Sequence, residues 1–135
     1  MVRALYTGPY VTATVDDQSN LVRYVRSAEP YPSLEVVREL HHELHRILAT
    51  LPSGKLALLM DMRQAPARND DPFELEVTEA VKAMLPRFTA HVFLVKSAVG
   101  RLQVLRLAKS RGDGAMAVFV DEQEALEWVG STRSS

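Results

Sequence analysis

Three short and almost continuously apolar runs, at residues 55–61, 90–95 and 115–120, constrain the fold of this 135-residue chain more than any other feature. Each run is followed by a segment in which apolar residues recur at helical spacing. Strands that are buried on both faces appear as continuous apolar runs, which is typical of parallel strands covered by helices. The three runs therefore predict neighbouring parallel strands in an α/β sheet.

The first third of the chain predicts antiparallel strands instead. Residues 2–7, 10–15 and 21–26 are rich in β-branched and aromatic side chains, and Gly8-Pro9 and a polar cluster at 16–20 separate them. Within residues 10–15 apolar and polar side chains alternate, which indicates a strand with one buried face. We expect an antiparallel meander that adds its strands to the edge of the parallel sheet.

Apolar spacing and capping residues predict about four helices. Ser33, Asp71 and Asp121 stand where N-caps are expected, and a Glu three residues after each of the last two completes a capping box. The predicted helices cover residues 33–50, 72–85, 97–111 and 122–130. The predicted order is β-β-β-α-β-α-β-α-β-α, in one mixed-sheet domain at residues 1–130 with a flexible tail at 131–135.

Composition limits the classes of partner. Lys and Arg total 16 and Asp and Glu total 17, so the net charge is −1. The surface as a whole therefore lacks the electrostatic driving force for binding nucleic acid, and we expect no nucleic-acid partner. The predicted third helix carries a modest basic face, which we expect to be solvated; its members are Arg101, Arg106, Lys109 and Arg111.

The chain contains no cysteine, which excludes disulfides, thiolate metal sites and thiol catalysis. No apolar stretch approaches the length of about 18 residues that a conventional membrane span needs. The first residues show no signal-peptide pattern. We therefore expect a cytoplasmic protein without a membrane span and without a cofactor.

The most polar stretch of the chain directly follows the first of the three buried runs. In open α/β sheets, ligands and partners gather outside the carboxyl ends of the strands. Arg63 and Arg68 are the leading binding candidates there, because a guanidinium bonds carboxylate or phosphate in a bidentate way and a nearby helix N-terminus favours anions. Asn69 and Asp70 follow them. The loop offers no Ser, Thr, Cys, His or Lys, and so lacks the usual nucleophiles.

Two further groups bear on this predicted site. Lys96, Ser97 and Arg101 follow the second buried run, and we expect them beside the first loop if the two strands are neighbours. Ser97 is also a good N-cap for the predicted third helix. Asp61, at the end of the first run, could bond the loop backbone, pair with Arg63, or act as an acid or base.

Histidines raise the question of a metal site. His41 and His45 lie four residues apart, hence on one helical face, a spacing that suits metal binding. The metalloprotease pattern needs His-Glu-x-x-His, however, and this chain is one residue short, with His42-Glu43-Leu44-His45. Only His91 remains as a further imidazole. We therefore expect no metal.

The order of elements resembles the STAS domain family, in particular its SpoIIAA-like branch of anti-sigma-factor antagonists. The resemblance covers roughly residues 10–130, from the hairpin and long helix through the junction at 96–102 to the strand end and acidic-capped helix at 119–126. It implies a regulatory, non-catalytic domain. In regulatory members a Ser or Thr at the start of the helix after the functional loop is phosphorylated, which releases the partner; here Asn69, Asp70 and Asp71 occupy that place.

Three functions are compatible with these observations. The first is a non-catalytic module that docks another protein through its strand-end loops, with the helix at 33–50 as a surface for self-association into a homodimer. The second is binding of a small amphipathic ligand such as a lipid, because STAS-like folds partly resemble Sec14-type lipid-binding domains; this needs a pocket between sheet and helices. The third is an enzyme that uses Asp61 as an acid or base.

Overall fold

The computed structural model describes residues 2–52, 54–66, 71–97 and 116–134. Six strands form one sheet in the order of the sequence. They are β1 (Val2–Thr7), β2 (Val11–Asp16), β3 (Leu21–Arg26), β4 (Ala57–Asp61), β5 (His91–Leu94) and β6 (Met116–Phe119). The first three strands are antiparallel to one another, and β3 to β6 are parallel. The predicted meander and the predicted parallel strands are thus confirmed.

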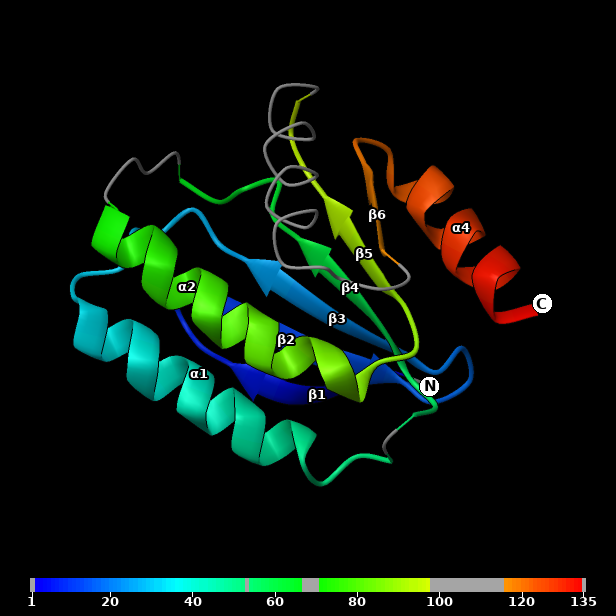
Figure 1. Cartoon of the computed structure of the whole chain (residues 1–135), viewed down its shortest axis with the longest axis horizontal. Coiled ribbons are helices and arrows are strands. Elements are labelled where there is room, and N and C mark those ends of the chain that lie inside the picture. The colour runs from blue at the N-terminus through cyan, green and yellow to red at the C-terminus, as the bar shows by residue number, and fades with distance from the viewer. Residues whose placement is uncertain (1, 53, 67–70, 98–115, 135) are drawn as a thin grey trace.

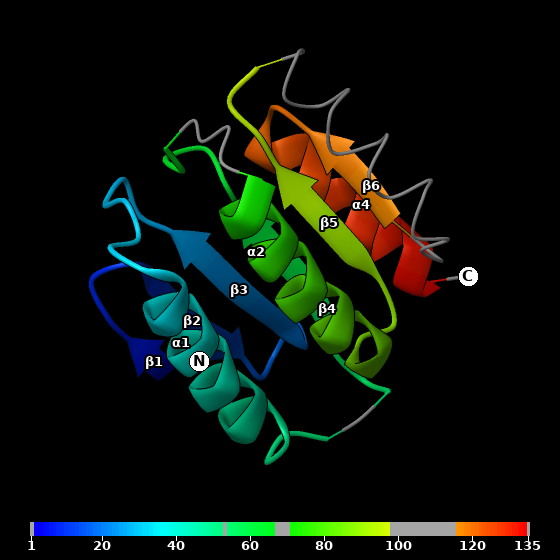
Figure 2. The same ribbon diagram turned by 60° about the vertical axis from the view of Figure 1, so that its left-hand side comes forward.

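Helices cover both faces of the sheet (Figures 1 and 2). On one face lie α1 (Leu34–Leu48) and α2 (Asp71–Met84), and on the other lies α4 (Glu122–Ser134). A short 3-10 turn, η1 (Leu85–Arg87), follows α2, with Pro86 in the position where the sequence predicts the helix to end. Residues 98–111 of the predicted third helix lie outside the described residues.

In α1 the local sequence determines both where the helix begins and which of its faces packs on the sheet. The Ser33 hydroxyl oxygen accepts from the backbone N–H of Val36 (3.2 Å), as expected for an N-cap. Apolar side chains at helical spacing then form a buried stripe that packs on the sheet, namely Val37, Leu40, Leu44 and Leu48. His41 is buried beside this stripe.

Alternate residues of the parallel strands fill two cores. Leu58 and Met60 of β4 point toward α1 and α2, whereas Leu59 of β4 and Leu94 of β5 point toward α4, where Ala125 packs on them. Leu59 and Leu94 have no exposed surface. Burial on both faces is the physical reason why these strands have continuous apolar sequences.

The closing helix is longer than the sequence predicts. We expect it to end at Gly130, before a tail at 131–135, but α4 continues to Ser134. A glycine ends a helix when it takes a left-handed conformation. Among the described residues that glycine conformation occurs at Gly54 (φ +80°) and not at Gly130, so Gly130 remains within α4.

Candidate functional site

The carboxyl ends of β4, β5 and β6 form one edge of the sheet. Asp61 pairs with Leu94 in the parallel register, and the backbone N–H of Met62 donates to the carbonyl of Leu94 (2.8 Å). One strand further, the N–H of Val95 donates to the carbonyl of Phe119 (3.0 Å). The segments that leave β4 and β5 therefore start side by side, as the sequence predicts.

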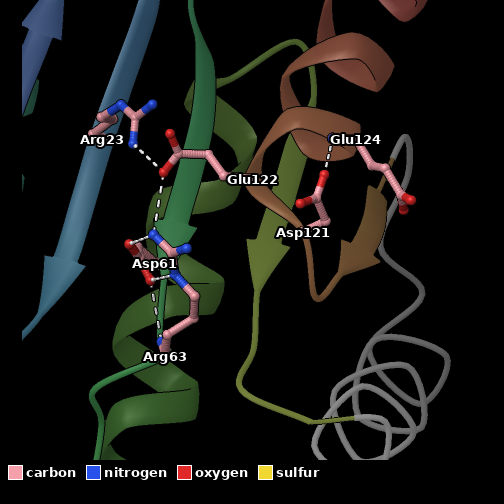
Figure 3. A network of polar contacts seen from close by, with 6 residues as sticks. All are labelled: Arg23, Asp61, Arg63, Asp121, Glu122 and Glu124. Carbon is pink, nitrogen blue, oxygen red and sulfur yellow. Dashed lines mark hydrogen bonds and ion pairs between the residues drawn. The ribbon is translucent and has the colours of Figure 1, made fainter.

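A carboxylate at the end of β4 holds the segment that follows it. The Oδ1 atom of Asp61 accepts from the backbone N–H of Arg63 (3.1 Å) and from its Nε (2.9 Å), while Oδ2 accepts from Nη2 (2.7 Å). Two of the sequence alternatives for Asp61, a bond to the loop backbone and a pair with Arg63, are thus both observed. The contact is bidentate, which fixes the direction of the Arg63 side chain (Figure 3).

Glu122 extends this contact across the sheet. Its Oε1 atom accepts from Nη2 of Arg63 (3.1 Å) and from Nη1 of Arg23 (3.3 Å), so that β3, the segment after β4 and the first turn of α4 are joined (Figure 3). The neighbouring Asp121 caps α4 by accepting from the N–H of Glu124 (3.0 Å), as the predicted capping box requires. We call Arg23, Asp61, Arg63 and Glu122 the edge network.

The edge network shifts the pKa values of Asp61 and Arg63. Hydrogen bonds from the Arg63 side chain and backbone, together with its positive charge, lower the pKa of Asp61, and they outweigh the effect of burial. The same contact raises the pKa of Arg63. Asp61 is therefore a carboxylate at neutral pH, whereas a general acid at that pH needs a raised pKa.

The predicted binding residues have different places in the structure. Arg63 belongs to the edge network and its side chain is 36% exposed. Lys96 and Ser97 are exposed at the end of β5, beside the segment that follows β4. Arg68, Asn69, Asp70 and Arg101 lie outside the described residues, and so do the side chains of Asp71 and Glu74.

Three of the four histidines make hydrogen bonds within the fold. His41 donates from Nδ1 to the carbonyl of Val37 (2.9 Å), so its Nε2 accepts from the Tyr24 hydroxyl (3.0 Å). His45 and His91 donate from Nε2 to the carbonyls of Ala80 (3.2 Å) and Leu85 (2.7 Å). Within the described ranges no three His, Cys, Asp or Glu side chains are grouped as metal ligands.

A second polar cluster lies under α1 and was not predicted. Arg26 is 4% exposed, and its Nη1 donates to the carbonyls of Tyr10 (3.1 Å) and Ser27 (2.8 Å). The guanidinium lies 4.0 Å from the centre of the Tyr31 ring, a cation–π contact. Tyr24 and Tyr31 are both buried, so neither side chain forms part of an exposed recognition surface.

Membrane insertion finds no support in the helices that the structure describes, since none of them combines the length and the apolar character that crossing a bilayer requires.

Comparisons with known proteins bear on the fold. No family model matches the sequence, and no curated protein is significantly similar to it. The chain is similar to the crystal structure of an uncharacterised protein of the DUF3478 family from Shewanella loihica PV-4, which has a SpoIIAA-like fold. The TM-score is 0.60, with 11% sequence identity, over 96% of this chain and 92% of that chain. The present chain therefore has a SpoIIAA-like fold, as the resemblance predicts.

Proposed function

We propose that this SpoIIAA-like domain is a non-catalytic module that docks a protein partner on the carboxyl edge of its parallel strands. The observation that carries the proposal is the pairing of Met62 with Leu94, which brings the segments after β4 and β5 together on one edge. Rigid strands with polar loops at their ends are a common architecture for recognition surfaces.

Within this surface the arginine and the lysine have different tasks. Arg63 is held by two acids, so it shapes the loop and presents only part of its guanidinium. Lys96 is exposed and makes no ion pair within the described part of the chain. An unpaired cation at an interface rim raises the rate of encounter with an acidic partner and contributes to specificity. We therefore assign the first contact with the partner to Lys96.

The sequence of the loop also bears on regulation. No Ser, Thr or Tyr occurs between Met60 and Glu76, so this loop cannot carry the phosphate that controls regulatory members of the STAS family. We propose that Asp70 and Asp71 supply permanent negative charge in its place. Docking at this edge is then independent of a kinase that acts on the loop.

Photocrosslinking in the native host tests the docking edge. A photoreactive amino acid replaces Lys96 in one variant and Lys82 in another. Lys82 is a matched control, because it is also an exposed lysine but lies in the last turn of α2, far from the end of β5. We expect one crosslinked species of defined mass from position 96 and none from position 82.

Competition in extracts then tests the role of the Lys96 charge. An excess of wild-type protein should suppress the crosslink at position 96, and an excess of the Lys82→Glu variant should suppress it equally well. The Lys96→Glu variant should need an about tenfold higher concentration to suppress the crosslink to the same extent. Equal crosslinking from both positions, or equal competition by both variants, would contradict the proposed edge.

A further inference from the structure

A groove lies on the face of the sheet that carries α4. This helix packs mainly on β5 and β6 and also contacts Leu21 of β3, and it leaves the surface of β1 and β2 on its side uncovered by the described residues (Figures 1 and 2). The groove has a volume of about 380 Å³. Four apolar side chains line it, namely Val2, Leu21, Leu126 and Val129.

Apolar surface is exposed at one end of the groove, whereas Leu21 and Val129 on its floor are largely buried. Val2 is 61% exposed although it belongs to a strand. Gly130 adds further room, since a Cβ atom built on it would meet no atom within 4 Å. Small-molecule sites measure about 300–1,000 Å³ and combine an apolar lining with a few polar groups. This groove has the size for a small ligand.

Arg23 supplies the charged group of the groove. Only its Nη1 is engaged, at 3.3 Å from Glu122, while Nε and Nη2 make no hydrogen bond with any described residue. Nε and Nη2 lie on the same side of a guanidinium and together match the two oxygens of a carboxylate. The arginine can therefore bind a carboxylate on that side without leaving the edge network.

The acid that lines the groove is occupied elsewhere. Asp16 turns its Oδ1 atom toward the backbone N–H groups of Gln18 (3.0 Å) and Ser19 (3.5 Å) in the turn between β2 and β3. These bonds lower the pKa of Asp16, and its carboxylate charge is directed to the turn. Arg23 is thus the lining charge that has unused hydrogen-bonding capacity.

We propose that this groove binds a small carboxylic acid with an unbranched apolar chain. The carboxylate pairs with Nε and Nη2 of Arg23, and the chain lies against Leu21, Leu126 and Val129. The volume of about 380 Å³ favours an acid of medium chain length. The groove shares Arg23 with the edge network but uses neither the segment after β4 nor the segment after β5, so the proposal does not depend on the proposed function.

Titration with sodium octanoate, followed by ¹⁵N NMR spectra of the full chain, tests the proposal. We expect saturable shifts of the amides around Leu21, Leu126 and Val129, with a dissociation constant of about 1 mM for a ligand of this size. Octanol has the same chain without the charge, and it should bind at least about tenfold more weakly.

Two variants locate the ligand. Arg23→Gln removes the charge, and we expect affinity for octanoate to fall by about tenfold, with no change for octanol. Gly130→Leu fills the groove from α4, and we expect it to abolish binding of both ligands. Arg38→Gln and Glu127→Leu are the matched controls, because both positions are exposed and neither lines the groove; they should bind octanoate as the wild type does.

The outcomes separate the proposal from its alternatives. Saturable binding that is lost in Arg23→Gln and in Gly130→Leu establishes the site. The proposal is overturned if the amide shifts do not saturate when the octanoate concentration reaches about ten times the expected dissociation constant. Binding that is equal in all four variants, or shifts that map to the opposite face, overturns it as well. Thermal unfolding of each variant verifies that the fold is kept.

Discussion

At the scale of single residues, buried or half-buried polar side chains in this domain are used to position other groups. Asp61 holds the backbone and the guanidinium of Arg63, and Glu122 ties that guanidinium to Arg23. His41 joins its own helix backbone to Tyr24 of β3. These contacts hold polar atoms that would otherwise lose their bonds to water on folding.

Substitution Asp61→Asn should show the energetic weight of the edge network. It keeps the size of the side chain but removes the charge, and we expect the free energy of unfolding to fall by about 1–2 kcal/mol at pH 7 in urea denaturation. The folded state lowers the pKa of Asp61, so its stabilisation is present above the pKa of about 4 that the unfolded chain has and is lost below it.

The difference between Asp61→Asn and wild type should therefore shrink as the pH is lowered to about 3. Asp17→Asn is the control, since Asp17 pairs with Arg3 at a site where both side chains are more than half exposed. It should change stability little at any pH. A loss in Asp61→Asn that is no larger than in Asp17→Asn would mean that the network does not hold the loop.

His41 should make the domain sensitive to mildly acidic pH. Burial lowers the pKa of His41 below its usual value, and this effect outweighs the hydrogen bond to the Val37 carbonyl, which raises it. The nearby His45 and Arg26 lower the pKa a little further, and Glu76 opposes them. The unfolded chain therefore binds the proton more readily, and stability should decrease as the pH falls below about 6.5. In His41→Gln this part of the pH dependence should disappear.

Urea denaturation at several pH values between 7.5 and 5, about one pH unit apart, would measure how the free energy of unfolding changes. The control is His42→Gln, because His42 is exposed on the same helix. An identical pH dependence in wild type and His41→Gln would show that His41 is protonated as easily in the folded domain as in the unfolded chain.

At the scale of elements, the sequence predicts most helices and strands, because the buried face of an element and its capping residues form recognisable local sequence patterns. The alternation of Val11, Ala13 and Val15 predicts a strand with one buried face, and all three are buried. Ser33 and Asp121 cap the helices that their positions predict. Boundaries are less exact, as the extension of α4 through Gly130 shows.

Two glycine substitutions test how these boundaries are set. Gly130→Ala should stabilise the domain by about 0.5–1 kcal/mol, because the residue is helical and a Cβ meets open space. Gly54→Ala should destabilise it by about 1 kcal/mol, because Gly54 has a φ of +80°. Changes of the same sign in both variants, measured by thermal unfolding, would contradict this assignment of their conformations.

Contacts between distant elements are the part that the sequence could not predict. Arg23 and Glu122 are 99 positions apart and meet only because the order of strands brings β3 and α4 to the same face. Glu122 lies within a recognisable capping box, but the box indicates only the start of a helix. The burial of Arg26 could not be predicted from the local sequence, since arginine is mostly exposed in proteins and the partners of Arg26 are backbone carbonyls.

At the scale of the whole molecule, the two faces and the two ends of the sheet differ in what lies on them. The face toward α1 and α2 holds the larger core, and the described residues cover the face toward α4 only in part. The carboxyl end gathers the segments after β4 and β5 and the edge network. The cores of this SpoIIAA-like fold lie between the layers, and we propose that the carboxyl end receives the partner.

The clearest test of this arrangement is amide hydrogen exchange of the full chain with and without the partner identified by crosslinking. Docking on the carboxyl edge predicts slower exchange at residues 62–66 and 95–97 when the partner is bound, and unchanged exchange at residues 54–56 and 85–90 at the opposite end. Protection at the opposite end with none at residues 62–66 and 95–97 would contradict it.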